Sequence, residues 1–171
     1  MIPEPLFSLA LALEAGEWGD EARIEALAQT ALEAAAADLT RNEAQPFPSE
    51  PPEVSLVLAD DAMMTGINSE WRAQAKPTNV LSFPAFPLTP GAMPGPMLGD
   101  IILARETIER EAGDLGKPVD EHITHLVVHG FLHLFGYDHI QNEDAEKMEA
   151  IETRILTSLN LSDPYGDIEP V

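Results

Sequence analysis

The segment that most constrains the fold runs from residue 119 to residue 135. The segment is almost continuously apolar, and its apolar residues at helical spacing include Val119, Ile123, Val127 and Leu134. Four of the five histidines of the chain interrupt it at intervals of three or four and form a single polar stripe: His122, His125, His129 and His133. This pattern predicts a buried α-helix with one polar stripe, around which the other elements must pack.

The spacing of two of these histidines suggests a metal site. His129 and His133 are four residues apart, so on a helix their imidazoles stack on one face, about 6 Å apart along the axis. Gly136 readily adopts the left-handed conformation that ends a helix, and the chain then turns back so that His139 is available as a third ligand. Zinc accepts imidazole nitrogens, and three protein ligands leave a fourth position for water, as in catalytic sites.

Other interpretations of the histidines stay open. An isolated histidine on an apolar helix face is more often a packed core residue than a ligand, and packing or support of the ligands is the favoured interpretation for His122 and His125. A metalloprotease helix carries the pattern His-Glu-x-x-His, but Gly130 occupies the position of its glutamate base. Imidazole ligands suit zinc without excluding copper or nickel.

Composition narrows the remaining choices. The 171 residues suit one domain, predicted to span 1–171 with a mobile acidic tail from about 160 to 171. The absence of cysteine excludes disulfides and thiolate metal ligands.

No apolar run is long enough to cross a membrane and no basic leader is present, so we expect a cytoplasmic protein that is not bound to a membrane. The net charge of −21 disfavours nucleic acid unless basic residues gather in a local groove. Oligomeric state is left open.

The periodicity predicts four strands and five helices. The strands are expected at 5–13, 54–59, 80–83 and 98–104. The helices are expected at 21–39, from 61 to an end between 72 and 75, at 105–112, at 119–135 and at 142–159. Asp20 is the expected cap of the first helix, Asp60 or Asp61 of the second, and Asn142 of the last. Trp71 is expected to contact the core, and the last helix is assigned to packing rather than to chemistry.

Three motifs carry a resemblance to a known family. They are His129-Gly130-x-Leu132-His133-Leu134-x-Gly136-Tyr137-Asp138-His139, Pro77-Thr78-Asn79-Val80-Leu81-Ser82-Phe83-Pro84 and Gly99-Asp100-Ile101. Together they resemble the YbeY family of bacterial endoribonucleases that mature ribosomal RNA, in order from about Val54 to His139.

The resemblance implies both a fold and a site. The fold would be a single α+β domain with a small mixed sheet flanked by helices, the zinc-bearing helix lying against the sheet in a zincin-like arrangement. One zinc ion is expected on His129, His133 and His139. A functional arginine is expected at Arg72, which sequence alone would have assigned to a surface ion pair. Arg72 and His129 are thus the residues predicted to act in catalysis.

The implied function is cleavage of single-stranded RNA in ribosomal RNA maturation and ribosome quality control, with precursor RNA and the ribosome or its proteins as partners. Zinc would activate water while Arg72 stabilises phosphate charge, and Asp138 would orient a ligand imidazole. The residues leave open whether water or the 2′-hydroxyl attacks, and none is an obvious general base. Two alternatives are a metal-dependent hydrolase of peptide or amide bonds and a non-catalytic ribosome-assembly factor with a structural metal.

Overall fold

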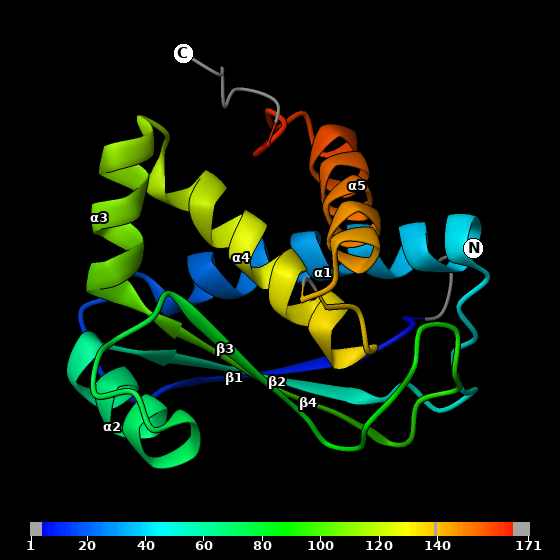
Figure 1. Cartoon of the computed structure of the whole chain (residues 1–171), viewed down its shortest axis with the longest axis horizontal. Helices are drawn as coiled ribbons and strands as arrows, with labels where there is room; N and C mark the ends of the chain where they lie inside the picture. The colour runs from blue at the N-terminus through cyan, green and yellow to red at the C-terminus, as the bar shows by residue number, and fades with distance from the viewer. Residues whose placement is uncertain (1–4, 139, 166–171) are drawn as a thin grey trace.

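Four strands form one mixed sheet at the centre of the computed structural model, which describes residues 5–138 and 140–165 (Figure 1). The strands are β1 (Ser8–Leu13), β2 (Glu53–Ala59), β3 (Val80–Pro84) and β4 (Met97–Ala104), in the order β1-β2-β4-β3. β1, β2 and β4 are parallel, whereas β3 runs antiparallel to β4. β3 is therefore an edge strand, with one side of its backbone available to a neighbouring cleft.

Five helices cover the two faces of this sheet unequally. They are α1 (Glu21–Glu43), α2 (Asp61–Arg72), α3 (Arg105–Leu115), α4 (Val119–Leu134) and α5 (Asn142–Ser158). Figure 1 shows α1 and α4 on one face, with α5 beyond them, and α2 on the opposite face. Asp20 and Asp60 cap α1 and α2, because each carboxylate accepts a hydrogen bond from a backbone N–H of the first turn.

Side chains of β2 point alternately to the two faces of the sheet and enter two separate hydrophobic clusters. Val54, Leu56 and Leu58 are fully buried in the large cluster that also holds the apolar sides of α1 and α4. Ala59 belongs instead to a smaller cluster with Met64 of α2. Successive side chains of a strand point to opposite faces, so one strand serves both cores. The larger core surrounds α4 and holds it in place.

Two glycines explain how closely α4 packs and where it ends. A Cβ atom on Gly130 would lie 2.9 Å from Cγ2 of Ile101 and 3.0 Å from Oγ of Ser82, so only glycine fits between the helix and the sheet. Gly136 has φ of 99° and follows the end of α4, a conformation that favours glycine. The histidine helix is thus seated directly on β3 and β4.

The sequence predictions agree with this fold in class, as a single α+β domain with a mixed sheet flanked by helices. Trp71 was wrongly predicted to contact the core: its side chain is 68% exposed. Asn142 was wrongly predicted to cap α5, because it is the first residue of that helix. Gln141 occupies the cap position, and its side chain makes no capping hydrogen bond. Across residues 5–138 and 140–165, no helix is long and apolar enough to span a membrane. Of the predicted mobile tail, residues 166–171 lie outside the described residues.

Candidate active site

A cleft of about 690 Å³ opens beside the edge strand β3. One wall is α4, which contributes His129 and His133. The opposite wall is the end of α2 and the segment that follows it, which contribute Arg72 and Lys76. Residues of β3 form the floor between the two walls, and the hydroxyl of Ser82 donates to the backbone oxygen of Gly130, 3.2 Å away. The cleft therefore brings together three of the residues that the sequence singled out.

The two histidines face each other across one helical turn. Nε2 of His129 and Nε2 of His133 are 3.0 Å apart, and the two rings are nearly perpendicular, at 81°. Two imidazole nitrogens that share one tetrahedral zinc ion lie about 3.3 Å apart, given bonds of about 2.0–2.1 Å. This pair of nitrogens therefore fits two ligands of a single ion with little adjustment.

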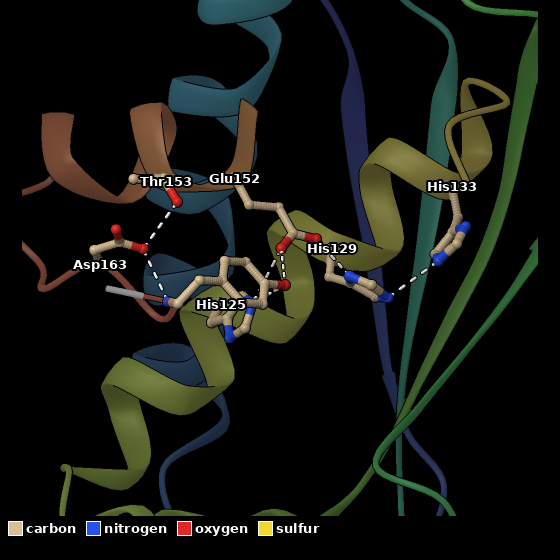
Figure 2. A network of polar contacts seen from close by, with 7 residues as sticks. His125, His129, His133, Glu152, Thr153 and Asp163 are labelled. Carbon is tan, nitrogen blue, oxygen red and sulfur yellow. Dashed lines mark hydrogen bonds and ion pairs between the residues drawn. The ribbon is translucent and has the colours of Figure 1, made fainter. Parts of the chain in front are cut away.

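A buried carboxylate holds the first of these imidazoles in place (Figure 2). Glu152 of α5 has no exposed surface, and its Oε1 accepts a hydrogen bond from Nδ1 of His129. Because an ionised carboxylate only accepts, Nδ1 of His129 carries a proton, and in the neutral ring the lone pair is on Nε2. Figure 2 shows His133 on the far side of the His129 ring from Glu152. Glu152 thus sets the tautomer that metal binding at Nε2 requires.

Two further donors complete the surroundings of Glu152. Nε2 of His125 lies 3.3 Å from Oε2 of Glu152, and the hydroxyl of Tyr165 donates to the same oxygen. Burial alone would raise the pKa of the Glu152 carboxyl, but the hydrogen bonds from His125, His129 and Tyr165 outweigh it and lower that pKa to about 2. Burial and the Glu152 charge raise the pKa of the Tyr165 hydroxyl. Glu152 is therefore ionised and Tyr165 neutral at pH 7.

Glu152 was missed by the sequence predictions, which assigned the whole of α5 to packing. Its position carried a signal, because Met148, Glu152 and Ile155 are spaced by four and three residues and lie on one helix face. A carboxylate on the apolar face of an amphipathic helix requires buried partners. Asp138, the carboxylate chosen from the sequence, lines the cleft and accepts a hydrogen bond from the backbone N–H of Ile140.

The third predicted ligand, His139, lies outside the described residues. Among residues 5–138 and 140–165, no group of three or more His, Asp or Glu side chains is arranged to hold a metal ion. The described part of the chain therefore supplies two convergent imidazoles, and the assignment of His139 stays a prediction.

The first two histidines of α4 lie apart from this pair. His122 is 4% exposed, and its Nε2 lies 2.8 Å from a carboxylate oxygen of Glu111. Burial lowers the pKa of His122. Nδ1 of His122 and Nδ1 of His125 are buried without a hydrogen-bond partner in the described part of the chain. His125 contacts Glu152 and so supports the site, whereas the role of His122 is packing against α3.

Basic charge is scarce in this acidic chain, and its distribution is uneven. Five of the nine lysines and arginines form ion pairs with carboxylates within the described residues: Arg23, Arg105, Arg110, Lys147 and Arg154. Arg72 and Lys76 make no such pair in that part of the chain, and both are exposed at the cleft. Their charge is available to an anionic ligand.

The groups gathered at the cleft are of the kind that hydrolytic enzymes use. A rigid helix carries two convergent imidazoles, a buried carboxylate orients one of them, and exposed cations face them across an open cleft. Such an arrangement is suited to activating water or another hydroxyl against an anionic substrate.

Comparison with known proteins identifies the family. The family model of endoribonuclease YbeY matches residues 14–160. Relatives named Endoribonuclease YbeY include that of Sinorhizobium fredii, 60% identical over 93% of this chain and 92% of its own length, and that of Sinorhizobium medicae, 60% identical over 95% and 97%. The chain belongs to the endoribonuclease YbeY family.

A solved structure shares the fold. The solution structure of TM1509 from Thermotoga maritima aligns with a TM-score of 0.52 over 94% of this chain and 98% of that one. At 22% identity the two chains share an arrangement of helices and strands.

Proposed function

We propose that this chain is a zinc-dependent endoribonuclease that cleaves single-stranded RNA during ribosomal RNA maturation and ribosome quality control in the cytoplasm, in contact with the ribosome or its proteins. The observation that carries the proposal is the pair of Nε2 atoms of His129 and His133, 3.0 Å apart at a cleft that also holds Arg72. Family membership supports RNA as the substrate, because relatives over nearly the whole chain are named endoribonucleases.

The metal ligands in this proposal are His129, His133 and His139. The chemistry that zinc supplies when bound is Lewis acidity, which activates water and polarises a phosphoryl oxygen. Glu152 fixes the His129 ring so that its Nε2 faces that of His133, and this removes the cost of ordering the ring on binding.

Arg72 has a separate role in the proposal. Its guanidinium is planar and always charged, and it presents several N–H donors to phosphate oxygens. Because no carboxylate among the described residues pairs with Arg72, its donors are available for the negative charge that develops during phosphodiester cleavage. Lys76 adds a second cation on the same wall. The carboxylates of Glu111 and Asp138 also line the cleft, so its formal charges balance, in contrast to the net charge of −21 of the whole chain.

The packing of Gly130 argues against the peptide-hydrolase alternative. This position would carry the glutamate base of a His-Glu-x-x-His helix, but a Cβ atom there already meets Ile101 and Ser82 at 2.9–3.0 Å. A glutamate side chain has no space at this position. The helix therefore presents metal ligands to the cleft without the base that such proteases use.

The decisive experiment measures metal content and RNA cleavage on the same samples. Elemental analysis of the purified wild type should give near-stoichiometric zinc, and the protein should cleave single-stranded RNA. In His133→Ala both zinc and cleavage should be lost together. His122→Asn is the matched control, because this histidine is on the same helix but bonds to Glu111 away from the pair, and it should keep both.

Two outcomes would contradict the proposal. If His133→Ala retained full cleavage at matched folded concentration, the histidine pair would not be the active centre. If the wild type held zinc but cleaved neither free RNA nor RNA in ribosomes, the metal would be structural, as in the ribosome-assembly alternative.

A further inference from the structure

Trp71 is the most exposed aromatic side chain of the described residues, and it lies next to the cleft. It belongs to the last turn of α2 and is 68% exposed, whereas the other tryptophan, Trp18, is 3% exposed. Large aromatic residues are usually buried, because each one covers a large apolar area. An indole left in solvent beside a candidate active site therefore suggests a ligand that covers it.

The Trp71 ring has one aromatic neighbour. It packs against Phe83 of β3 in an edge-to-face contact, with ring centroids 6.3 Å apart and an interplanar angle of 61°. This contact links the end of α2 to the edge strand. Because Phe83 is itself partly buried against the smaller core, it gives the indole a firm support.

The position of this aromatic pair relates it directly to the histidines. Along β3, Ser82 points towards α4, where its hydroxyl meets the backbone of Gly130, and Phe83 points to the opposite face. Both neighbours of Phe83, Ser82 and Pro84, line the cleft, as does Arg72 next to Trp71. The aromatic pair therefore adjoins the cleft through Arg72, Ser82 and Pro84, on the face of β3 opposite to the histidine helix.

The charges beside Trp71 select the kind of ligand. Arg72 and Lys76, neither in an ion pair among the described residues, lie on the same wall and attract phosphates. Asp100 is exposed and paired in register with Phe83, so one carboxylate lies on the same face of the sheet as the aromatic pair. Cations next to an exposed aromatic ring are the combination that binds single-stranded nucleic acid, in which unpaired bases stack on rings.

We propose that Trp71 is a stacking platform for one base of the single-stranded RNA whose backbone is held by Arg72 and Lys76. This inference rests on the proposed function and identifies where the substrate leaves the cleft. The platform requires an unpaired base, because the faces of paired bases are covered by their neighbours in a duplex. The aromatic pair would therefore favour single strands over duplexes.

The test compares Trp71→Ala, Trp71→Phe and Phe86→Ala in the full-length, metal-loaded protein. Phe86 is the matched control, since it is 59% exposed on the loop after β3 and neither of its chain neighbours lines the cleft, whereas Trp71 is next to the cleft residue Arg72. For cleavage of a single-stranded RNA, Trp71→Ala should raise KM about tenfold, in the range of roughly 5-fold to 100-fold. Trp71→Phe should have a KM much closer to the wild-type value, because phenylalanine keeps an aromatic face, and Phe86→Ala should leave KM unchanged.

Fluorescence gives a second readout that does not depend on cleavage. Since Trp18 is buried, exposed tryptophan emission comes from Trp71, and a 2′-O-methyl strand of the same sequence should quench it. The platform alone would be overturned if the wild type cleaved RNA, Trp71→Ala kept the same KM, and the 2′-O-methyl strand did not quench the wild-type emission. That result would point instead to a protein partner that covers Trp71. Absence of RNA cleavage and of quenching in the wild type would overturn the proposed function and the platform together.

Discussion

The two walls of the cleft are built in opposite ways. On the α4 wall, His129 is held by Glu152, whose carboxylate is fully buried and is also bonded to His125 and Tyr165. On the α2 wall, Arg72 and Lys76 are exposed and have no ion pair in the described part of the chain. The comparison indicates a division of labour: buried polar contacts fix the geometry of the reacting groups, while exposed cations stay adjustable for a flexible, charged substrate.

The largest expected effect comes from replacing Glu152, which supports the α4 wall of the cleft. Glu152→Ala removes the buried carboxylate that accepts hydrogen bonds from His125, His129 and Tyr165, so the free energy of unfolding should fall by about 3 kcal/mol, measured by denaturant titration. The affinity for zinc should fall roughly 10-fold to 100-fold. Glu146→Ala changes an exposed carboxylate of the same helix and should alter stability by less than about 0.5 kcal/mol. Equal behaviour of the two variants would refute the role given to Glu152.

The next effect comes from the exposed wall. Arg72→Ala should lower kcat for RNA cleavage by about 100-fold, because a donor to the developing phosphate charge is lost. Its stability should change by less than about 0.5 kcal/mol, unlike that of Glu152→Ala. Arg41→Ala is the matched control, since Arg41 also lies in the last turn of a helix but does not line the cleft. Equal cleavage by both arginine variants would remove Arg72 from the mechanism.

A pair of glycine substitutions tests how tightly the helix of each wall packs against its neighbours. Gly130→Ala forces a Cβ atom against Ile101 and Ser82 and should destabilise the fold by about 1–3 kcal/mol. Gly66→Ala on α2 meets nothing within 4 Å and should stabilise it by about 1 kcal/mol, because alanine favours a helix. Thermal unfolding of both variants measures the difference. The same sign of change in both would contradict the contrast between the walls.

The smallest effect concerns pH. Burial lowers the pKa of His122 from its ordinary 6.5, so the unfolded chain binds a proton at a higher pH than the folded chain. Stability from this group is fully present above pH 6.5 and is lost as the pH falls below it. His122→Gln should flatten the dependence of unfolding free energy on pH below 6.5, by at most about 1.4 kcal/mol per pH unit. An unchanged slope in the variant would show that another group carries the acid sensitivity.

Much of the fold followed from local pattern. Asp20 and Asp60 marked helix starts because a short acidic side chain caps the first free N–H groups of a helix. The apolar periodicity of 119–135 indicated a buried helix, and the structure places α4 between the sheet, α1 and α5. Helix ends were less well predicted: α1 continues to Glu43 rather than to residue 39, because an alanine-rich segment has no strong stop signal until Ala44 turns the chain.

Two of the residues that were wrongly predicted from the sequence, Trp71 and Glu152, are decided by tertiary contacts. Trp71 fits the apolar spacing of α2, yet it is exposed, because α2 covers only part of its face of the sheet. Glu152 appeared to be one of many acidic residues on an amphipathic helix, yet it is buried, because α5 packs across the histidines of α4. Periodicity reports which face of a helix is apolar, but not which partner that face meets.

By itself, the sequence determined the buried helix, the pairing of His129 with His133 and the resemblance to one enzyme family. The first two depend on residues close together in the chain, where helical geometry alone sets the distances, and the third depends on the order of short motifs along it. Only the tertiary structure decided that Glu152 orients His129, and it brings Arg72 to the cleft where the resemblance had implied that this arginine lies. Those contacts join residues far apart in the sequence, and their distances exist only once the helices have packed around the sheet.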